Sequence, residues 1–446
     1  MKELKLEEIQ GVLLSGYKKL QYCRYILLQI NDPASFKNFL KSTPFQDTKT
    51  RPENACYNIA FTQTGLKKLG VDVNEKNGFS IDFIEGMDSK HKQRLLGDLG
   101  QSSPEKWEWG NTDHPVDGLL MVFATSNERL DEEINTLLSP TSANGFEEVS
   151  SISSQLLNGK EHFGFEDGIS QPRVKGFPPT KNLINDDNTL NPGEFILGYD
   201  NGYDVSPLSP EIDGFDFGSE GTYLVMRQLE QDTDLFWRSM MKYADQEKDE
   251  AIKLASKFVG RWPNGNPLTL FEENSEAVEE QNNFNFYHQD RDGFKCPFGS
   301  HIRRSNPRDS MDDAPEQSID MSNKHRILRR GRPYGPPIDA DMDIKKMMDV
   351  PKDDQKRGLV FICLNTDISR QFDFVQGHWI NNRKFNGFYN DLDPLMGSSP
   401  TEDSIEFEIQ DQPFRKRITG IPEFVKVVGG AYFFLPKIST INYLAQ

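Results

Sequence analysis

The stretch Arg24-Tyr-Ile-Leu-Leu-Gln-Ile-Asn-Asp32 gives the first indication of the fold, because a stretch of the same kind, Gly221-Thr-Tyr-Leu-Val-Met-Arg-Gln-Leu229, occurs in the second half of the chain. Both stretches are rich in β-branched, aromatic and other apolar residues, which favour strands. A helix is predicted to follow each of them, beginning near Pro33 in the first case and covering residues 233–243 in the second. The repeat predicts that one structural unit occurs twice.

A second pair of matching segments supports the repeat. Asp117-Gly-Leu-Leu-Met-Val-Phe-Ala-Thr125 and Arg357-Gly-Leu-Val-Phe-Ile-Cys-Leu-Asn365 are apolar runs with a shared Gly-Leu near the start and the length of a buried strand. The run Val427-Val-Gly-Gly-Ala-Tyr-Phe-Phe-Leu-Pro436 is predicted to be a strand that closes the second sheet. This mixture predicts an α+β fold with two ferredoxin-like domains, each an antiparallel sheet with peripheral helices.

The predicted domain boundary falls in a segment rich in Asn, Asp, Pro and Gly, residues 178–210, a composition that favours loops. We therefore expect an N-terminal domain at 1–210 and a C-terminal domain at 211–446. Further loops are predicted around residues 263–292 and 303–323.

The composition limits the classes of function. A chain of 446 residues with 36% hydrophobic residues can form packed cores, and a net charge of −18 argues against a nucleic-acid partner. The N-terminus lacks an apolar run typical of a secretory signal, and no stretch reaches the roughly 18 apolar residues of a membrane span. We expect a cytoplasmic protein without a membrane partner. The four cysteines show no Cys-x-x-Cys spacing and are expected to be buried, inert thiols.

A local inversion of charge points to a cofactor site. The stretch Cys296-Pro-Phe-Gly-Ser-His301-Ile-Arg-Arg-Ser-Asn-Pro-Arg308 places one histidine beside three arginines in an acidic chain. A neutral histidine nitrogen can bind a metal, and guanidinium groups can bind carboxylates. An anionic metal cofactor is therefore expected here, and haem with its two propionates fits. Arg303, Arg304 and Arg308 are the propionate candidates, of which at least one is expected to be only a surface charge.

Two further segments complete a set of chemical groups. Gly164-Phe-Glu-Asp167-Gly-Ile-Ser-Gln-Pro172 is an acidic loop with glycines that let its backbone approach a flat ligand. His325-Arg-Ile-Leu-Arg329-Arg-Gly-Arg-Pro-Tyr-Gly335 is a second basic run. Together the three segments supply a metal ligand, an acid/base and a fixed positive charge, which are the parts that a peroxidase needs.

With these three motifs in this order, the chain resembles the larger members of the dye-decolorizing peroxidases, haem enzymes of the dimeric ferredoxin-like, chlorite dismutase-related superfamily. The resemblance implies that His301 is the proximal iron ligand, Asp167 the distal acid/base and Arg329 the distal arginine. It also implies that haem lies between the sheet and the helices of the C-terminal half. Further positions that match haem-contacting or pocket-lining residues of the family are Gly168, Ile169, Ser170, Asn306, Pro307, Arg308, Leu359 and Phe361.

The resemblance further implies a peroxidase with one haem b per chain. Asp167 would take a proton from hydrogen peroxide and return it to the leaving oxygen, while Arg329 would stabilise the charge that develops as the O–O bond breaks. The expected partners are hydrogen peroxide and small phenolic, dye-like or other aromatic reductants, and the chain is expected to be a monomer or a homodimer.

Several alternatives stay open at this stage. The carboxylate that bonds the second ring nitrogen of His301 is Asp391 or Asp393, with Glu423 as a third candidate. The arginines around Arg329 could form a solvated basic run, and Leu359 and Phe361 could be ordinary core residues. A non-haem metal site made by His162, His301 and His325 is disfavoured because the arginines would repel a bare dication. A haem carrier or sensor, or a haem-modifying, deferrochelatase-like protein, is the alternative function.

Overall fold

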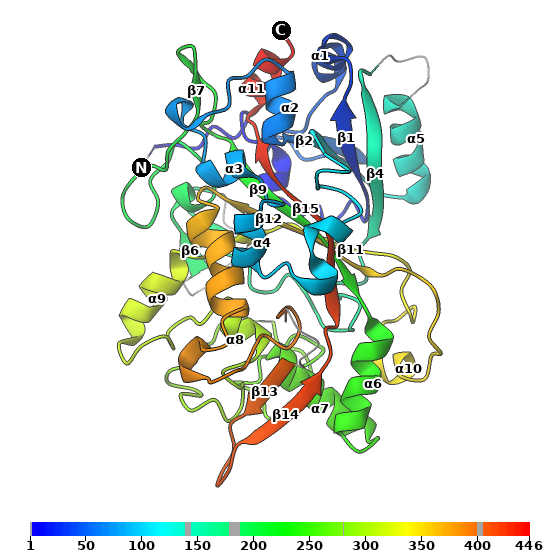
Figure 1. Ribbon diagram of the computed structural model, residues 1–446, viewed down its shortest axis with the longest axis vertical. Coiled ribbons are helices and arrows are strands. Elements are labelled where there is room, and N and C mark those ends of the chain that lie inside the picture. Colours follow the sequence, from blue (N-terminus) through cyan, green and yellow to red (C-terminus); the bar gives the residue numbers. More distant parts are fainter. Residues whose placement is uncertain (1, 139–143, 178–187, 280, 399–404) are drawn as a thin grey trace.

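The computed structural model describes residues 2–138, 144–177, 188–279, 281–398 and 405–446 (Figure 1). Its centre is a single antiparallel sheet to which both halves of the chain contribute. The first half provides strands in the order β4-β1-β3-β2, with the bounds Tyr22–Ile30 (β1), Ala55–Phe61 (β2), Gly118–Ala124 (β3) and Phe146–Gln155 (β4).

The second half provides a matching set of strands. Strand β9 lies between β15 and β12, and the short strands β10 and β11 pair with β12. Their bounds are Thr222–Gln231 (β9), Leu328–Arg329 (β10), Arg332–Tyr334 (β11), Gly358–Asn365 (β12) and Val425–Leu435 (β15). The five strands predicted from the apolar runs are thereby confirmed.

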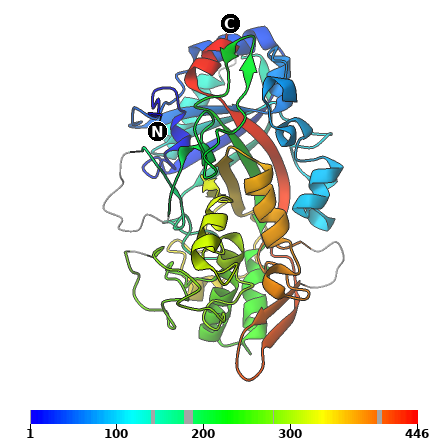
Figure 2. The same ribbon diagram turned by 90° about the vertical axis from the view of Figure 1, so that its left-hand side faces the viewer.

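The two sets of strands join at both edges and close the sheet into a barrel. Phe434 of β15 pairs with Phe61 of β2, and Tyr334 of β11 pairs with Ser154 of β4. Figure 2 shows β15 in red as a long curved strand along this barrel. The sequence predicted two facing ferredoxin-like units but not the pairs that fuse their sheets.

Alternation along the strands separates an interior from an exterior. Leu27 of β1, Met226 of β9 and Ile362 of β12 belong to one buried cluster formed inside the barrel. Ile26 and Val225, their chain neighbours, belong to a different cluster, which includes residues from the helices outside. The outer face of the barrel is therefore the surface on which a helix-covered site can form.

The helices and the remaining strands surround this barrel (Figure 1). The helices are α1 (Pro33–Ser42), α2 (Gln63–Lys68), α3 (Ile81–Glu85), α4 (Lys90–Leu96), α5 (Asn127–Leu137), α6 (Thr233–Tyr243), α7 (Lys248–Val259), α8 (His301–Ser305), α9 (Pro315–Asn323), α10 (Ile344–Met347) and α11 (Ile438–Leu444). Two π-helical segments cover Ser369–Asp373 and Val375–Ile380. Small two-stranded pairs are formed by β5 (Arg173–Val174) with β6 (Thr189–Leu190), β7 (Glu211–Ile212) with β8 (Phe215–Asp216), and β13 (Ile405–Ile409) with β14 (Lys416–Ile421).

The loop predicted at residues 303–323 is partly wrong, because residues 315–323 form α9. The sequence of α9 has only a weak apolar stripe, which is why the helix was missed. Polar contacts help to hold this helix in place: the hydroxyls of Ser318 and Ser322 donate to the carbonyl of Arg308 at 3.0 and 2.7 Å. The predicted loop at 178–210 lies outside the described residues over 178–187.

Two predictions from composition have structural outcomes. All four cysteines are buried free thiols, and burial raises the pKa of Cys23 and Cys56 to about 12. Among the described helices, none has the length and hydropathy needed to cross a membrane.

Candidate active site

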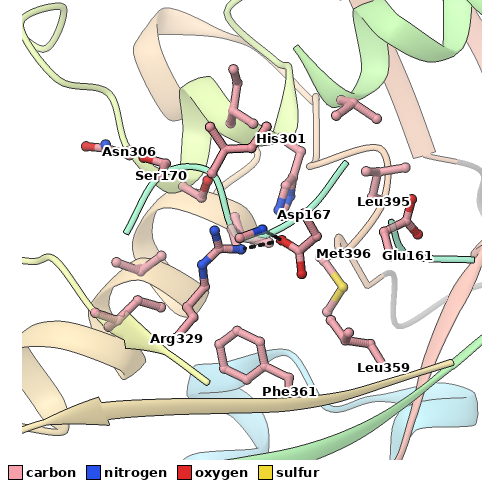
Figure 3. Close-up of a pocket in the computed structure, with 18 of the residues that line it drawn as sticks. Glu161, Asp167, Ser170, His301, Asn306, Arg329, Leu359, Phe361, Leu395 and Met396 are labelled. Atoms are coloured by element: carbon pink, nitrogen blue, oxygen red, sulfur yellow. Dashed lines mark hydrogen bonds and ion pairs between the residues drawn. The ribbon is translucent and has the colours of Figure 1, made fainter. Parts of the chain in front are cut away.

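A cavity lies between the outer face of β9 and β12 on one side and α8, the π-helical segments and the loop of residues 159–172 on the other (Figure 3). Most residues singled out from the sequence line it: Asp167, Gly168, Ile169, Ser170, His301, Asn306, Arg308, Arg329, Leu359 and Phe361. Pro307, Asp391 and Asp393 are buried and are not among the described residues that line the cavity. The fold thus brings three distant motifs to one site.

His301 is the first residue of α8, and its ring is oriented by a buried carboxylate. Its Nδ1 atom donates a hydrogen bond to Oδ2 of Asp393 at 2.9 Å. Burial alone would lower the pKa of His301, but the charge and hydrogen bond of Asp393 outweigh it and raise the pKa. Because Nδ1 carries the hydrogen, Nε2 of the neutral ring is the atom that can bind a metal.

The structure distinguishes the three carboxylates that the sequence left open. Asp393 accepts from His301 and also from the backbone N–H groups of Leu395 and Met396. Asp391 instead accepts from the N–H of Glu408 at 2.8 Å. Glu423 accepts from the hydroxyl of Ser398 at 3.3 Å. Only Asp393 of these three bonds His301 in the described part of the chain.

Asp167 lies on a tight hairpin whose shape requires glycine. The N–H of Asp167 donates to the carbonyl of Gly159 at 2.8 Å, and Lys160 is bridged to Glu166. At the turn, Gly164 has φ of +94°, and a Cβ there would lie 2.6 Å from a side-chain carbon of Ile344. The hairpin therefore needs glycine at position 164 to keep this shape.

Asp167 and Arg329 form an ion pair that faces the cavity. A terminal guanidinium nitrogen of Arg329 donates to Oδ1 of Asp167 at 3.2 Å, and Figure 3 shows this contact beside His301. The backbone N–H of Arg329 also donates to the side chain of Gln171 at 3.0 Å, which ties β10 to the Asp167 loop. Glu166 accepts instead from Gln281 at 3.3 Å.

The interpretation of the arginines around Arg329 as a solvated run is wrong. Arg326 donates to Asn188 and Ser170, Arg330 to the carbonyls of Val12 and Leu13, and Arg332 to the carbonyls of Gly16, Tyr17 and Leu20. Arg326 and Arg332 are buried. Arg326, Arg330 and Arg332 thus hold loops together, whereas Arg329 bonds Asp167.

The three arginines proposed to bind propionates, Arg303, Arg304 and Arg308, also differ in what they contact. Arg303 and Arg304 are buried, and neither is among the described residues that line the cavity. Arg303 bonds Asp290, and Arg304 donates to the carbonyls of Trp379 and Asp391. Neither is a surface charge, and Arg308 lines the cavity, so the expectation that at least one of the three is only a surface charge is wrong. Arg308 lines the cavity and lies over the ring of Phe284 at 3.9 Å.

The cavity contains polar residues that sequence reasoning missed: Glu161, Arg227, Gln231 and Arg261. Arg227, Leu229 and Gln231 alternate along β9, so the period of two in the predicted strand could have placed them on one face. Nothing local in the sequence marks Glu161 or Arg261, because their place in the cavity depends on how loops fold over the sheet.

The residues present fit a flat, anionic metal cofactor. Nε2 of His301 offers one ligand atom, and Arg308 offers a positive charge at the cavity wall. The side-chain nitrogen of Asn306 is buried without a hydrogen-bond partner in the described structure, as expected where a ligand oxygen is missing. Much of the remaining wall is apolar: Leu359, Phe361, Val375, Ile380, Leu395 and Met396. Fold and cavity together indicate the class of haem-dependent enzymes.

Comparisons with known proteins agree with this class. A family model described as the DyP dimeric alpha+beta barrel domain matches residues 8–156. The multifunctional dye peroxidase DyP2 of Amycolatopsis sp. is 31% identical over 98% of this chain and 96% of its own length. Peroxidase 2 of Mycetinis scorodonius is 28% identical over 98% and 87%, respectively.

Solved structures extend the likeness to three dimensions. A fungal DyP-type peroxidase from Auricularia auricula-judae superposes with a TM-score of 0.83 at 27% identity and covers 100% of both chains. A dye-decolorizing peroxidase in complex with 2,6-dimethoxyphenol gives a TM-score of 0.81 at 26% identity, covering 99% of this chain and 100% of the other. The chain belongs to the dye-decolorizing peroxidase family and is a peroxidase, and enzymes of this family depend on haem.

Proposed function

We propose that this peroxidase binds one haem b per chain and reduces hydrogen peroxide with electrons from phenolic or dye-like donors. The observation that carries the proposal is the meeting of His301 and the Asp167–Arg329 pair in one cavity. The phenolic donor is supported by a related structure that contains 2,6-dimethoxyphenol. A haem carrier or sensor has no need for an acid and a guanidinium at this place.

Each residue has a separate task in this proposal. Haem held by His301 would supply the iron at which peroxide is reduced. Asp167 takes a proton from hydrogen peroxide and returns it to the oxygen that leaves as water. Arg329 stabilises the negative charge on that oxygen and holds Asp167 in place.

Other residues bind and orient the cofactor or exclude water from it. The side-chain nitrogen of Asn306 and the guanidinium of Arg308 would hold propionates, with the backbone of residues 168–170 beside the ring. Leu359 and Phe361 form an apolar wall that admits peroxide and excludes bulky donors. We also propose a domain boundary near residue 210, because β1–β4 end before it and β9 begins after it.

The visible spectrum of the protein expressed with haem available tests the function. We expect a Soret band that changes with one equivalent of hydrogen peroxide and is restored by 2,6-dimethoxyphenol. A Soret band indifferent to peroxide would favour the carrier, and loss of iron from haem would favour the haem-modifying alternative. The absence of any Soret band would overturn the haem site.

A further inference from the structure

Gln231 lies between two cavities. It lines the cavity of His301 and also a second cavity of about 770 Å³ beside α6 and the segment 347–357. The second cavity has more acidic than basic groups: Glu230, Asp232, Asp234, Asp349, Asp353 and Asp354 against Arg238, Lys352, Lys356 and Arg357. Gln231 thus belongs to the walls of both an acidic outer cavity and the candidate active site.

On the side of the His301 cavity, Gln231 forms a hydrogen bond with Glu161. Its side-chain nitrogen donates to Oε2 of Glu161 at 2.7 Å. The carboxylate of Glu161 also accepts from the N–H groups of Phe163 and Phe165 at 2.9 and 3.0 Å. Glu161 lines the same cavity as Asp167 and lies on the other arm of the same hairpin (Figure 3). The charge of Asp167 also acts on the carboxyl group of Glu161.

The bonding of Gln231 is incomplete in a way that suits two protonation states of Glu161. Its side-chain oxygen is buried and has no hydrogen-bond partner in the described structure. A protonated Glu161 would need an acceptor, and a half-turn of the amide of Gln231 would present that oxygen. Burial raises the pKa of Glu161 to about 7, with a further increase from the charge of Asp167, so both states are accessible near neutral pH.

The peroxidase reaction requires protons from outside the cavity. Reduction of one hydrogen peroxide to two waters consumes two electrons and two protons. The first water takes both hydrogens of the peroxide, one of them returned by Asp167, so both protons of the second water come from elsewhere. Donors that the apolar wall excludes cannot release their protons inside the cavity.

We propose that Glu161 passes protons from the side of the outer acidic cavity to Asp167, and that Gln231 orients the carboxyl group of Glu161 in both of its protonation states. The inference rests on the proposed function and adds to it a route for proton delivery, in which Glu161 carries the proton and Gln231 is a positioning residue. The other charged or titratable groups around the inner cavity are Glu166, Arg227, Arg261, His301, Arg308, His325, Arg326 and Arg329.

The test uses the haem-loaded protein, hydrogen peroxide and ferrocyanide, a donor that supplies electrons without protons. In Glu161→Gln, the step that forms the first water should keep its rate within about twofold, because Asp167 alone serves it. The later step, in which ferrocyanide reduces the oxidised enzyme and the second water forms, should slow by about 100-fold and lose its pH dependence near 7. Gln231→Leu, which removes the amide but keeps the carboxyl, should slow the same step.

A second measurement does not depend on haem. Infrared titrations of wild type and Glu161→Gln without haem should differ by the carbonyl band of one protonated carboxyl group, which disappears near pH 7 in the wild type. Glu147→Gln, at an exposed carboxylate of β4 that lines neither cavity, is the control and should keep both the band and the rates.

The outcomes separate this inference from the function on which it rests. If the wild-type protein does not react with peroxide, the proposed function fails while the infrared band still reports on Glu161. If wild type and Glu161→Gln share the same ferrocyanide rates and pH profile, the relay is wrong although the peroxidase stands. Identical infrared titrations of wild type and Glu161→Gln also overturn the relay.

Discussion

His301 Nδ1 and Asp393 Oδ2 lie 2.9 Å apart although 92 residues separate them in the chain. Two backbone N–H groups fix Asp393, and its pKa is lowered because the charge and hydrogen bond of His301 outweigh the effect of burial. An ionised Asp393 holds the hydrogen on Nδ1 and makes Nε2 more basic. The orientation of the His301 ring is therefore set by a contact that only the tertiary structure creates.

Asp393→Asn should make His301 harder to protonate. Without the charge of Asp393, burial would dominate, and the pKa of His301 should fall below its ordinary value in the protein without haem. Haem affinity should fall about 10- to 100-fold. Nuclear magnetic resonance of the imidazole and a haem titration measure the two effects. Asp391→Asn is the control, since Asp391 bonds Glu408; equal effects of both variants would contradict the assignment.

Asp167→Asn should retain haem but react slowly with hydrogen peroxide. The amide keeps the size of the carboxylate but cannot accept and return the proton, which should slow the reaction by about 10²- to 10⁴-fold. Stopped-flow absorbance after mixing with peroxide gives the rate. A rate equal to that of the wild type would remove Asp167 from the mechanism.

Arg329→Leu should slow the same reaction by about 10²- to 10³-fold, because the charge on the leaving oxygen would no longer be stabilised. Arg329→Lys keeps the positive charge but lacks the planar fork that bonds Asp167, and should fall between wild type and Arg329→Leu. Both variants should bind haem with wild-type stoichiometry in a spectroscopic titration. If lysine behaved like leucine, geometry rather than charge would account for the role of Arg329.

The sequence was sufficient where motifs and strand patterns are local. Asp167, His301 and Arg329 stand in distinctive motifs and line one cavity, and the apolar runs at β1 and β9 have the expected length. It was insufficient where tertiary contacts decide. Arg303 and Arg308 look equivalent in one basic run, but the first is buried against Asp290 and the second reaches the cavity.

The same limit applies to the choice between Asp391 and Asp393, which are two residues apart. Both are buried, and the direction of the chain after Ile380 decides which one reaches His301. Barrel closure is similar, because single residue pairs such as Phe434 with Phe61 leave no pattern in the sequence.

His162 should make the protein sensitive to mild acid. It is fully buried, its Nε2 donates to the carbonyl of Tyr334 at 2.7 Å, and its Nδ1 lacks a hydrogen-bond partner in the described structure. Burial lowers its pKa to about 4. The unfolded chain thus binds a proton that the folded chain excludes, so the free energy of unfolding should fall as pH drops from about 6.5 to 4, by about 3 kcal/mol at most.

His162→Gln is the variant that isolates this effect. Glutamine keeps a donor for Tyr334 but does not titrate, so the difference in unfolding free energy between wild type and variant should change over that pH range. Urea unfolding at several pH values measures it. A difference that stays constant with pH would show that His162 is not the acid-sensitive group.

Lys92 should be required for the stability of the wall behind the cavity. It lies on α4, is fully buried, and bonds both Asp82 and Asp373, while the hydroxyl of Tyr432 donates to Asp373 at 2.7 Å. Asp373 follows Phe372, which lines the cavity, so Lys92 connects a helix of the first half to the active-site wall of the second.

Lys92→Met keeps most of the apolar stem but leaves two carboxylates without their cation. Removing one partner of a buried ion pair costs about 3–5 kcal/mol, so the variant should unfold at much lower urea concentrations. Burial already raises the pKa of Asp373, and without Lys92 this carboxyl should be protonated more readily, which makes the loss smaller at low pH. Lys90→Met, at an exposed residue that bonds Glu105, should change the stability by less than about 1 kcal/mol. Similar losses in both variants would mean that the buried network does not support the cavity wall.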